Sequence, residues 1–581
     1  MKHMYAYLKP YRFAILLVFG LVALRAILDL LLPLILELLV SEGIGISEDA
    51  VDPDIGRVWE LAGVMFGATV LSIVVTVFGG YKEAKIAASF ARDLRKAVYE
   101  KIDSFSMREI DHFTTSSLIT RSTNDIQQLQ NYLNLLLRMI ILQPVLAVGA
   151  IGFSIAQQPT LSMLLIVSVL VLVIMLAVIF AVTLPRFQLI QKLVDRLNLV
   201  TRENLTGLRV VRAFNTEKEQ AARIDDASYR AMRLNVFVNR VTGVMWPVMS
   251  LIMGGTSLAI VYFGSRYFVG VDGFEPGSMM ALMQYAMRAI MAFMFLTIIF
   301  VLIPRATISA RRIAEVLAMD IAIHDPDEPV ELPEKMTGEV VFENVCFRYP
   351  GASVPVLDGI DFTAKAGEVT AIIGSTGSGK STLINLLPRF YERTGGSITI
   401  DGIDIKDMRQ EDLYSLIGYV PQKGVLFSGT IRSNILLGER QDEEAMRKAT
   451  RIAQAEEFVH GYENRYDHEI AQGGTNVSGG QKQRLSIARA IAKNPLIYVF
   501  DDSFSALDFS TDRKLRRLLK EEVHATKLIV AQRIMTIRDA EQIIVLDQGR
   551  IVGKGRHDEL MKTCEVYREI AYSQLDEEEL A

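Results

Sequence analysis

The feature that most constrains the fold of this chain is a series of long apolar runs in its first half. A helix needs roughly 20 consecutive apolar residues to cross a bilayer. Six runs reach this length, at 13–40, 58–81, 133–156, 160–184, 241–264 and 278–303. Half of the 581 residues are hydrophobic and the mean hydropathy is +0.26, which is high for a soluble protein. We therefore predict an integral, multi-pass membrane protein that has the lipid bilayer as its partner.

The charges that flank the spans predict their orientation. The N-terminal segment contains Lys2, Lys9 and Arg12, whereas residues 42–54 after the first span are acidic. Two long segments, 82–132 and 185–240, are rich in Lys and Arg, which favours the cytoplasmic side. The first run lacks the short core and small-residue cleavage site of a signal peptide. We expect both termini in the cytoplasm and a bacterial cell membrane around the spans.

The same two long segments are polar, have helical periodicity and contain almost no Pro or Gly. They could be solvated loops. Their length exceeds that of ordinary connections, which favours helices that project well beyond the membrane.

The second half of the chain has a different character. From about residue 338 short strand-like runs alternate with helical ones, as in an α/β domain. We predict a membrane domain at 1–304, a helical exit and Pro- and acid-rich linker at 305–337, a nucleotide-binding domain at 338–575 and an acidic tail at 576–581. The balance of 62 basic and 67 acidic residues gives no reason to expect nucleic acid as a partner. Cys346 and Cys564 lack ligand-like spacing, so neither a disulfide framework nor a zinc site is expected.

A phosphate-binding loop is the clearest functional motif. A strand-like run at 369–373 leads into Gly374-Ser-Thr-Gly-Ser-Gly-Lys-Ser381, and a helical pattern follows. Glycines let backbone N–H groups surround phosphate, Lys380 reaches the terminal phosphates, and the Ser381 hydroxyl can bind Mg²⁺. The predicted ATP contacts of this loop are Gly374, Ser375, Thr376, Gly377, Ser378, Gly379, Lys380, Ser381 and Thr382.

Two further segments fit the same chemistry. Residues 496–501 form a buried-strand pattern that ends in Asp501, the carboxylate expected to hold Mg²⁺ beside the loop. The segment Val477-Ser-Gly-Gly-Gln481 places small residues at the start of a helix, which makes a second anion site.

Together these motifs resemble the ABC transporter superfamily over essentially the whole chain. The resemblance implies the type IV (type I exporter) architecture, with six helical spans followed by an α/β P-loop domain. Tyr349, in Phe-Arg-Tyr-Pro, matches the aromatic residue that stacks on adenine, and Gln422 matches the glutamine that links the Mg²⁺ site to the membrane domain. The implied Mg²⁺ ligands are Ser381, Gln422 and Asp501. The implied signature motif is Val477, Ser478, Gly479, Gly480 and Gln481, and the implied D-loop is Ser505, Ala506, Leu507 and Asp508.

The resemblance also implies a partner. In the family two such chains pair, and each ATP lies between the P-loop of one chain and the signature motif of the other. Residues 112–125 and 203–214 resemble the intracellular loops that press short coupling helices onto the nucleotide-binding domains. The expected cofactors are ATP and Mg²⁺, and the expected partner is a second half-transporter.

Two residues depart from the family pattern at the catalytic positions. Asp502 stands where active members have a glutamate as general base, and Gln532 stands where they have a histidine. The shorter side chain withdraws the carboxylate, and an amide cannot be protonated. The signature motif is nearly intact, with Val477 where Leu is usual. This asymmetry resembles the degenerate-site subunit of heterodimeric exporters, so we expect slow hydrolysis in this chain's own pocket and faster hydrolysis at the composite site.

Charged residues within spans are costly and therefore candidates for function. Arg25 and Asp29 lie one helical turn apart and can pair, which favours a structural role. Glu37, Arg138 and Arg288 have no partner visible in the sequence.

Met283, Met287 and Met291 share one face of the sixth span. Helix packing is the simpler role of any single methionine, but flexible thioethers also suit a cavity for varied apolar ligands. The candidate substrate cavity consists of Glu37, Met283, Met287, Arg288 and Met291.

The function expected from these features is ATP-driven export of hydrophobic or amphipathic compounds, as in multidrug efflux. Export of lipid or peptide is one alternative. A regulatory subunit that senses ATP without pumping is another, and it would also fit Asp502 and Gln532.

Overall fold

The structure is a computed structural model that describes residues 6–44, 54–268, 276–437 and 442–574. The chain divides into two units, and each is described by itself. The first contains residues 1–103 and 116–318, and the second contains residues 104–115 and 319–581. The predicted acidic tail at 576–581 lies outside the described residues, as does most of the acidic segment 42–54.

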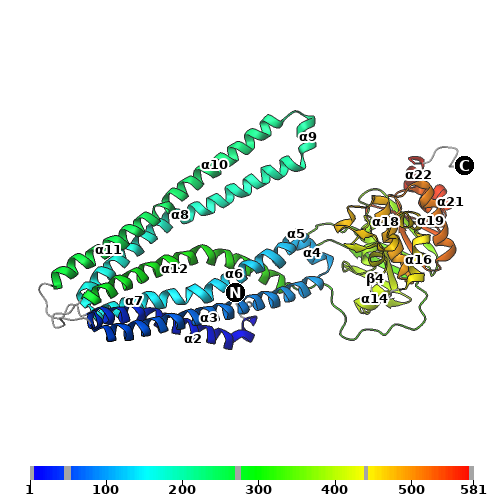
Figure 1. Cartoon of the computed structure of the whole chain (residues 1–581). Helices are drawn as coiled ribbons and strands as arrows, with labels where there is room; N and C mark the ends of the chain where they lie inside the picture. Colours follow the sequence, from blue (N-terminus) through cyan, green and yellow to red (C-terminus); the bar gives the residue numbers. More distant parts are fainter. Residues whose placement is uncertain (1–5, 45–53, 269–275, 438–441, 575–581) are drawn as a thin grey trace. The chain divides into compact units, whose positions relative to one another are not determined.

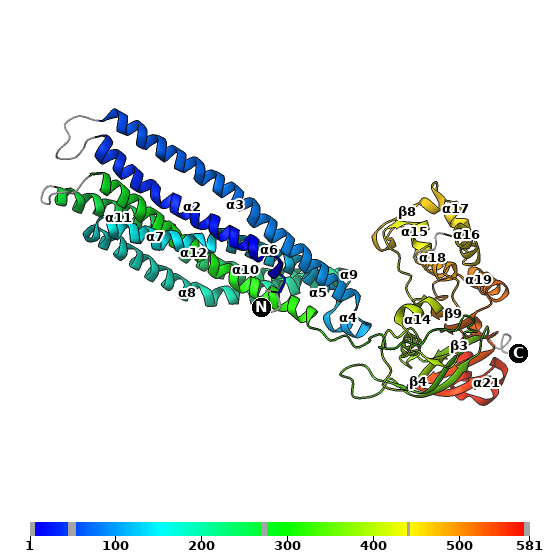
Figure 2. The same ribbon diagram turned by 90° about the horizontal axis from the view of Figure 1, so that it is seen from below.

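The first unit is helical. Over the described part of the chain, six helical segments are long and apolar enough to cross a membrane, which confirms the predicted six spans. Figures 1 and 2 show its long helices running along one another. Its elements are η1 (Lys9–Tyr11), α2 (Arg12–Leu38), η2 (Leu39–Gly43), α3 (Ile55–Asp103), α5 (Thr115–Thr120), η3 (Arg121–Asp125), α6 (Ile126–Leu135), η4 (Leu136–Ile140), α7 (Leu142–Gln157), α8 (Pro159–Thr206), α9 (Leu208–Ala213), α10 (Glu217–Gly243), α11 (Met245–Phe268) and α12 (Pro276–Leu317).

Several of these helices are much longer than a bilayer is thick. α3 has 49 residues and α8 has 48, so at about 1.5 Å per residue each is roughly 70 Å long, more than twice the hydrocarbon thickness. The polar segments at 82–132 and 185–240 are therefore mostly helical continuations of the spans. α8 and α10 pack against each other, and Figure 1 shows this hairpin, with α9 at its tip, diverging from α3, α6 and α12.

The second unit is the α/β domain. Five parallel strands and one antiparallel edge strand form a sheet in the order β12-β11-β3-β10-β9-β6, and β2-β1-β4-β5 form an antiparallel sheet. The strands are β1 (Val340–Phe347), β2 (Leu357–Ala364), β3 (Val369–Gly374), β4 (Gly395–Ile400), β5 (Ile403–Asp404), β6 (Ile417–Val420), β7 (Gly429–Thr430), β8 (Glu469–Ile470), β9 (Ile497–Asp501), β10 (Thr526–Val530), β11 (Gln542–Asp547) and β12 (Arg550–Gly555). The helices are α4 (Met107–Phe113), α13 (Lys380–Leu386), α14 (Gln410–Leu416), α15 (Ile431–Ile435), α16 (Glu443–Ile452), α17 (Glu456–His460), η5 (Arg465–Asp467), η6 (Gln472–Gly474), α18 (Gly479–Ala492), α19 (Phe509–Glu522), α20 (Ile534–Ile537), α21 (His557–Thr563) and α22 (Glu565–Tyr572).

The burial of the central strands explains their sequences. Every residue of β9 and β10 is buried, as expected for parallel strands covered on both faces. Two apolar clusters cover the sheet, one containing Ile373, Phe500 and Val545, the other Ile372, Val499 and Leu546. The C-terminal ends of β3, β9 and β10 therefore lie side by side, which brings the predicted nucleotide motifs to one edge.

Candidate functional site

The predicted phosphate-binding loop connects β3 to α13. A Cβ on Gly374 would lie 2.1 Å from the carbonyl oxygen of Leu546, so only glycine fits there. Gly377 and Gly379 have φ values of 85° and 99°, in the left-handed region that favours glycine. These positions turn the chain between strand and helix. The loop residues exposed to solvent are Ser375, Thr376 and Gly377.

Lys380 lies folded back on this loop. Its Nζ donates to the carbonyl oxygens of Gly374 at 2.9 Å and Ser375 at 2.7 Å, and burial lowers its pKa. The Ser381 hydroxyl donates to Asp501 Oδ1 at 2.9 Å. Burial raises the pKa of Asp501, while the Ser381 hydrogen bond lowers it.

The predicted Mg²⁺ ligands are oxygen donors, as this cation requires. Ser381 and Asp501 lie together, whereas the Gln422 amide nitrogen is directed toward Asp502. Among the described residues no group of three His, Cys, Asp or Glu side chains could hold a metal ion. Mg²⁺ is commonly held by one or two protein ligands, substrate phosphates and water, so Ser381 and Asp501 fit an ion that arrives with a nucleotide.

The two departures from the family pattern contact each other. Gln532 Nε2 donates to Asp502 Oδ2 at 2.8 Å, and Gln422 Nε2 donates to the same oxygen at 3.3 Å. Asp502 is buried and has a φ of 45°. Burial raises its pKa, against the lowering effect of the Gln422 hydrogen bond. Because an amide neither takes up nor releases a proton at neutral pH, these partners fix the carboxylate without relaying a proton.

Tyr349, the predicted adenine-stacking residue, lies beside a cavity of about 450 Å³ in the second unit. Its hydroxyl is 3.1 Å from that of Thr382, which follows the phosphate-binding loop. Its ring packs edge to face against Tyr391, with ring centroids 5.3 Å apart. The cavity is also lined by Arg348 and Arg108. An aromatic ring next to open space and close to the loop is suitably placed to stack on a base.

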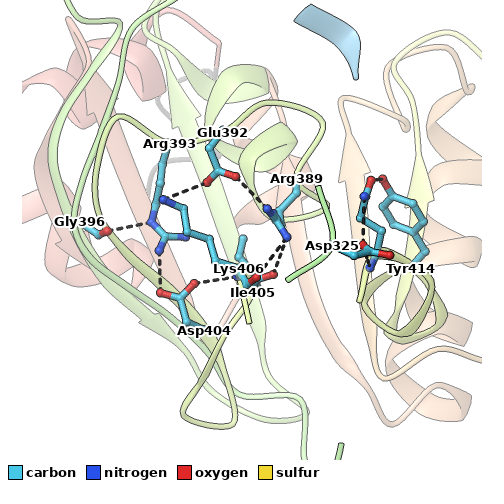
Figure 3. Close-up of polar contacts among 10 residues, drawn as sticks. Asp325, Arg389, Glu392, Arg393, Gly396, Asp404, Ile405, Lys406 and Tyr414 are labelled. Carbon is cyan, nitrogen blue, oxygen red and sulfur yellow. Dashed lines mark hydrogen bonds and ion pairs between the residues drawn. The ribbon is translucent and has the colours of Figure 1, made fainter. Parts of the chain in front are cut away.

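Two buried arginines hold the segment that follows α13 (Figure 3). Arg389 donates to the Glu392 carboxylate at 3.0 Å, and Arg393 donates to the Asp404 carboxylate at 2.6 Å. Tyr391 lies between the two arginines in the chain. The paired charges therefore fix the backbone from which the Tyr391 ring projects.

Tyr391 also contacts the short helix α4. Its hydroxyl donates to Asp111 Oδ2 at 2.6 Å. α4 begins with a capping box, in which the backbone N–H of Ser106 donates to Glu109 Oε2 at 2.8 Å. The short helix α5 lies within residues 112–125, where the resemblance implies one, and α4 lies mostly ahead of that range. The Ser-Met-Arg-Glu spacing is a helix-start signal that could have located α4.

The predicted signature motif forms the N-terminus of α18. The Ser478 hydroxyl accepts from the backbone N–H of Gln481 at 3.3 Å, and the backbone N–H of Ser478 donates to Gln481 Oε1 at 2.9 Å. Ser478 and Gly479 are exposed, so the helix start is open to a ligand. Val477 is buried in the core. The departure from the family pattern, Val477 in place of Leu, therefore lies in the core and not among the exposed residues of the motif.

The predicted D-loop joins the end of β9 to α19. The Ser505 hydroxyl donates to the backbone oxygen of Asp502 at 2.9 Å, and Asp508 caps α19 by accepting from Thr511 N–H at 3.0 Å. Hydrogen bonds from Thr511 and Ser510 lower the pKa of Asp508. Ala506 is exposed and Leu507 is buried.

Gln483 is a site residue that sequence reasoning missed. It is 1 % exposed. Its amide accepts from the Gly424 N–H at 2.8 Å and donates to the Pro421 carbonyl oxygen at 3.0 Å. These contacts bracket Gln422 from both sides. The sequence signal that could have located it is the amide side chain of Gln483 among the apolar residues on the buried face of α18.

Three of the charged residues of the spans, Arg25, Asp29 and Glu37, have partners in the structure. Arg25 Nε lies 3.7 Å from Asp29 Oδ2, and Ser72 donates to Asp29 Oδ1 at 3.0 Å. Pairing therefore accounts for both charges. Glu37 accepts a hydrogen bond from Gln157 of α7.

Of the three methionines on the predicted face of the sixth span, two pack against neighbouring side chains and one is exposed. Met283 packs beside the buried Tyr285, and Met291 packs in a second cluster with Ile290. Met287 is 52 % exposed. Packing accounts for two of the three methionines. Arg138 lies in η4, and Arg288 is half-buried next to Met287 in α12.

Comparison with known proteins relates both units to one family. A sequence model of the ABC transporter transmembrane region matches residues 15–301, and one of the ABC transporter matches residues 357–505. An uncharacterized ABC transporter ATP-binding protein of Mycobacterium tuberculosis is 38% identical over 575 residues, which cover 98% of this chain and 97% of that protein. The uncharacterized ABC transporter ATP-binding protein YfiB of Bacillus subtilis is 35% identical over 582 residues, which cover 100% of this chain and 99% of its own.

A solved structure gives the same architecture. The structure described as a bacterial Atm1-family ABC exporter with ATP bound has a TM-score of 0.79 and covers 98% of this chain and 99% of its own, at 24% identity. At that identity the likeness concerns the fold, which is a helical membrane domain followed by an ATP-binding cassette domain. The chain belongs to the ABC transporter family, and it contains the transmembrane region and the ATP-binding domain of that family in one polypeptide.

Proposed function

We propose that this chain is the degenerate-site subunit of a heterodimeric exporter, whose own pocket holds ATP and hydrolyses it slowly. The observation that carries the proposal is the contact of Asp502 Oδ2 with two amides, Gln532 at 2.8 Å and Gln422 at 3.3 Å. A general base must lie within about 2.6–3.2 Å of the proton it removes. The aspartate is one methylene shorter than the usual glutamate and is held by donors that cannot accept its proton.

The other residues of this pocket are suited to hold nucleotide. The backbone N–H groups of the loop would surround phosphate, and Lys380 would exchange its contacts with the Gly374 and Ser375 carbonyls for phosphate oxygens. Ser381 and Asp501 would hold Mg²⁺, which neutralises phosphate charge when bound. General-base catalysis contributes about 10²–10⁴-fold to a rate. Loss of the general base therefore predicts that turnover falls by at least about 10²-fold while the contacts that hold the nucleotide remain.

The signature motif supports a complementary role toward a partner. Ser478 and Gly479 are exposed at the start of a 14-residue helix, and such a helix end favours anions. We propose that this end completes a competent ATP site with the phosphate-binding loop of a second, different half-transporter. That partner would have Glu and His at the positions of Asp502 and Gln532.

The tip of the α8–α10 hairpin also supports pairing. Val210 in α9 and Phe214 just after it are 60 % and 75 % exposed. Exposed apolar side chains grouped at a tip favour a protein contact. We propose that α9 contacts the partner, and that Asp111 of α4 couples to this chain's own Tyr391.

We propose hydrophobic or amphipathic compounds as the substrates. The exposed Met287, with the half-buried Arg288 beside it in the chain, supports a cavity that accepts apolar molecules with a polar end. Lipid or peptide export is the alternative within transport, and an ATP-sensing regulatory subunit is the alternative outside it. Drug-stimulated ATPase activity of the pair would support the exporter, whereas a sensor would show no stimulation.

The test of the slow site is restoration of the two residues. The chain is purified with its partner, whose own phosphate-loop lysine is replaced by alanine so that only this chain's pocket turns over. We expect Asp502→Glu with Gln532→His to raise turnover by about 10²-fold or more. The matched control, Asp502→Asn with Gln532→His, restores the histidine without a base and should stay slow. If the unmodified pocket already turns over as fast as the restored one, the proposal is wrong.

A further inference from the structure

A cavity of about 840 Å³ in the second unit is not part of the predicted nucleotide site. One wall of the cavity is α19, which is labelled in Figures 1 and 2. The other walls are residues 535–540, which include the end of α20 and the segment after it, and residues of β3 and β10. None of the predicted nucleotide contacts lines it. Its volume is in the range of pockets that bind small molecules.

The lining of this cavity is strongly basic. Seven Lys or Arg residues line it among the described residues, against one carboxylate, Asp539. Four of the seven, Arg513, Arg516, Arg517 and Lys520, recur at helical spacing along α19 and so share one side of it. The solvated face of α16 differs, because it pairs the opposite charges of Glu443 and Arg447.

Three of the basic side chains have structural partners. Arg516 forms two hydrogen bonds with Asp512, at 3.0 and 3.2 Å. Lys520 lies 3.4 Å from Glu541. Lys527 is buried and donates to two backbone carbonyl oxygens, one of them of Val523 at 2.6 Å. These contacts account for their charge within the fold.

Arg513 and Arg517 are not accounted for in this way. They lie four residues apart on α19, where like charges destabilise a helix. Arg517 is 3.9 Å from Glu521, with both side chains well exposed, and such a pair contributes little. Lys514 adds a third exposed charge. The fold therefore keeps a cationic cluster at the cavity that does not stabilise the helix.

We propose that this cavity is a binding site for a small anion that bears phosphate groups. Planar guanidinium groups bind phosphate oxygens through paired hydrogen bonds, and Arg513 and Arg517 present two such groups one turn apart. Two classes of molecule carry such phosphate groups, soluble phosphorylated compounds and anionic phospholipids. α19 begins at the residue after Asp508, and α20 begins two residues after Gln532. A ligand bound between α19 and α20 would therefore contact the helix that follows the D-loop and the helix that follows Gln532.

The test uses the full-length chain in detergent with Lys380→Ala, so that the phosphate-binding loop does not take up the probe. Binding of inorganic tripolyphosphate is measured by titration calorimetry. We expect Arg513→Glu with Arg517→Glu to weaken binding at least ten-fold. The milder pair Arg513→Gln with Arg517→Gln should weaken it in the same direction. Thermal unfolding confirms that each variant folds.

A matched control has the same charge change elsewhere. Lys562→Glu with Arg568→Glu alters the exposed Lys562 of α21 and the half-buried Arg568 of α22 and should leave binding unchanged. Equal weakening in both pairs, or no binding by the starting chain, would overturn the proposal. Nanodiscs of phosphatidylglycerol and of phosphatidylcholine distinguish these two classes of molecule. Competition with tripolyphosphate by phosphatidylglycerol alone assigns the site to a headgroup, and competition by neither lipid assigns it to a soluble anion.

Discussion

Replacement of Gly374 by alanine should weaken ATP binding without unfolding the nucleotide-binding domain. A Cβ there would lie 2.1 Å from the Leu546 carbonyl oxygen and 2.7 Å from Ser378 Oγ, and real Cβ contacts essentially never fall below 3.0 Å. Leu546 is paired with Gly374 in the β11–β3 register, and β3 is also paired with β10. The strand cannot withdraw, so the phosphate-binding loop must move instead. Overpacking of this kind costs about 1–3 kcal/mol, which corresponds to about 5- to 150-fold weaker binding if it falls on the bound loop.

The assay is equilibrium binding of a fluorescent ATP analogue to the full-length chain in nanodiscs. Gly402→Ala is the matched control, because Gly402 has a φ of +80° with nothing within 4 Å of its Cβ position. It should cost about 1–2 kcal/mol of stability and leave ATP affinity unchanged. Affinity of the Gly374→Ala variant within two-fold of the wild type would refute the close-approach argument.

Three other outcomes follow from the described contacts. Burial raises the pKa of Asp502, so its carboxylate destabilises the fold increasingly as pH rises above the unfolded value of about 3.9. Asp502→Asn should therefore raise the melting temperature of the nucleotide-free chain at pH 7 but little at pH 4, and an equal gain at both pH values would contradict this. Tyr391→Phe removes the 2.6 Å hydrogen bond to Asp111, worth about 0.5–1.5 kcal/mol. It should lower substrate transported per ATP hydrolysed, and an unchanged ratio would remove Tyr391 from coupling. Met287→Ala should alter selectivity across a panel of dyes, whereas Met291→Ala should mainly lower thermal stability; the reverse pattern would place the cavity elsewhere.

The spans and the phosphate-binding loop could be predicted because their signals are local. A run of about 20 apolar residues has few stable fates other than a membrane helix. The loop needs glycine at fixed spacing, as Gly374, Gly377 and Gly379 illustrate. Asp501 could be placed beside it because strands of a parallel sheet end at a shared edge.

Contacts between distant segments could not be predicted. Asp111 and Tyr391 are 280 residues apart, and Glu37 and Gln157 are 120 apart. Their pairing depends on how helices and strands pack, which one sequence does not reveal. The mutual contact of Asp502 and Gln532 depends on the parallel register of β9 with β10, whereas their identities were readable from the chain.

The most direct test of the slow site is the fate of the nucleotide that it holds. The pair is given 8-azido-ATP labelled at the γ-phosphate, allowed about one turnover at its faster site, and irradiated so that each chain is labelled through its own adenine pocket, here beside Tyr349. The proposed function predicts that this chain keeps the γ-label, because ATP held by Gly374–Ser381 remains intact, while the partner chain loses it. Equal loss of the γ-label from both chains would contradict it.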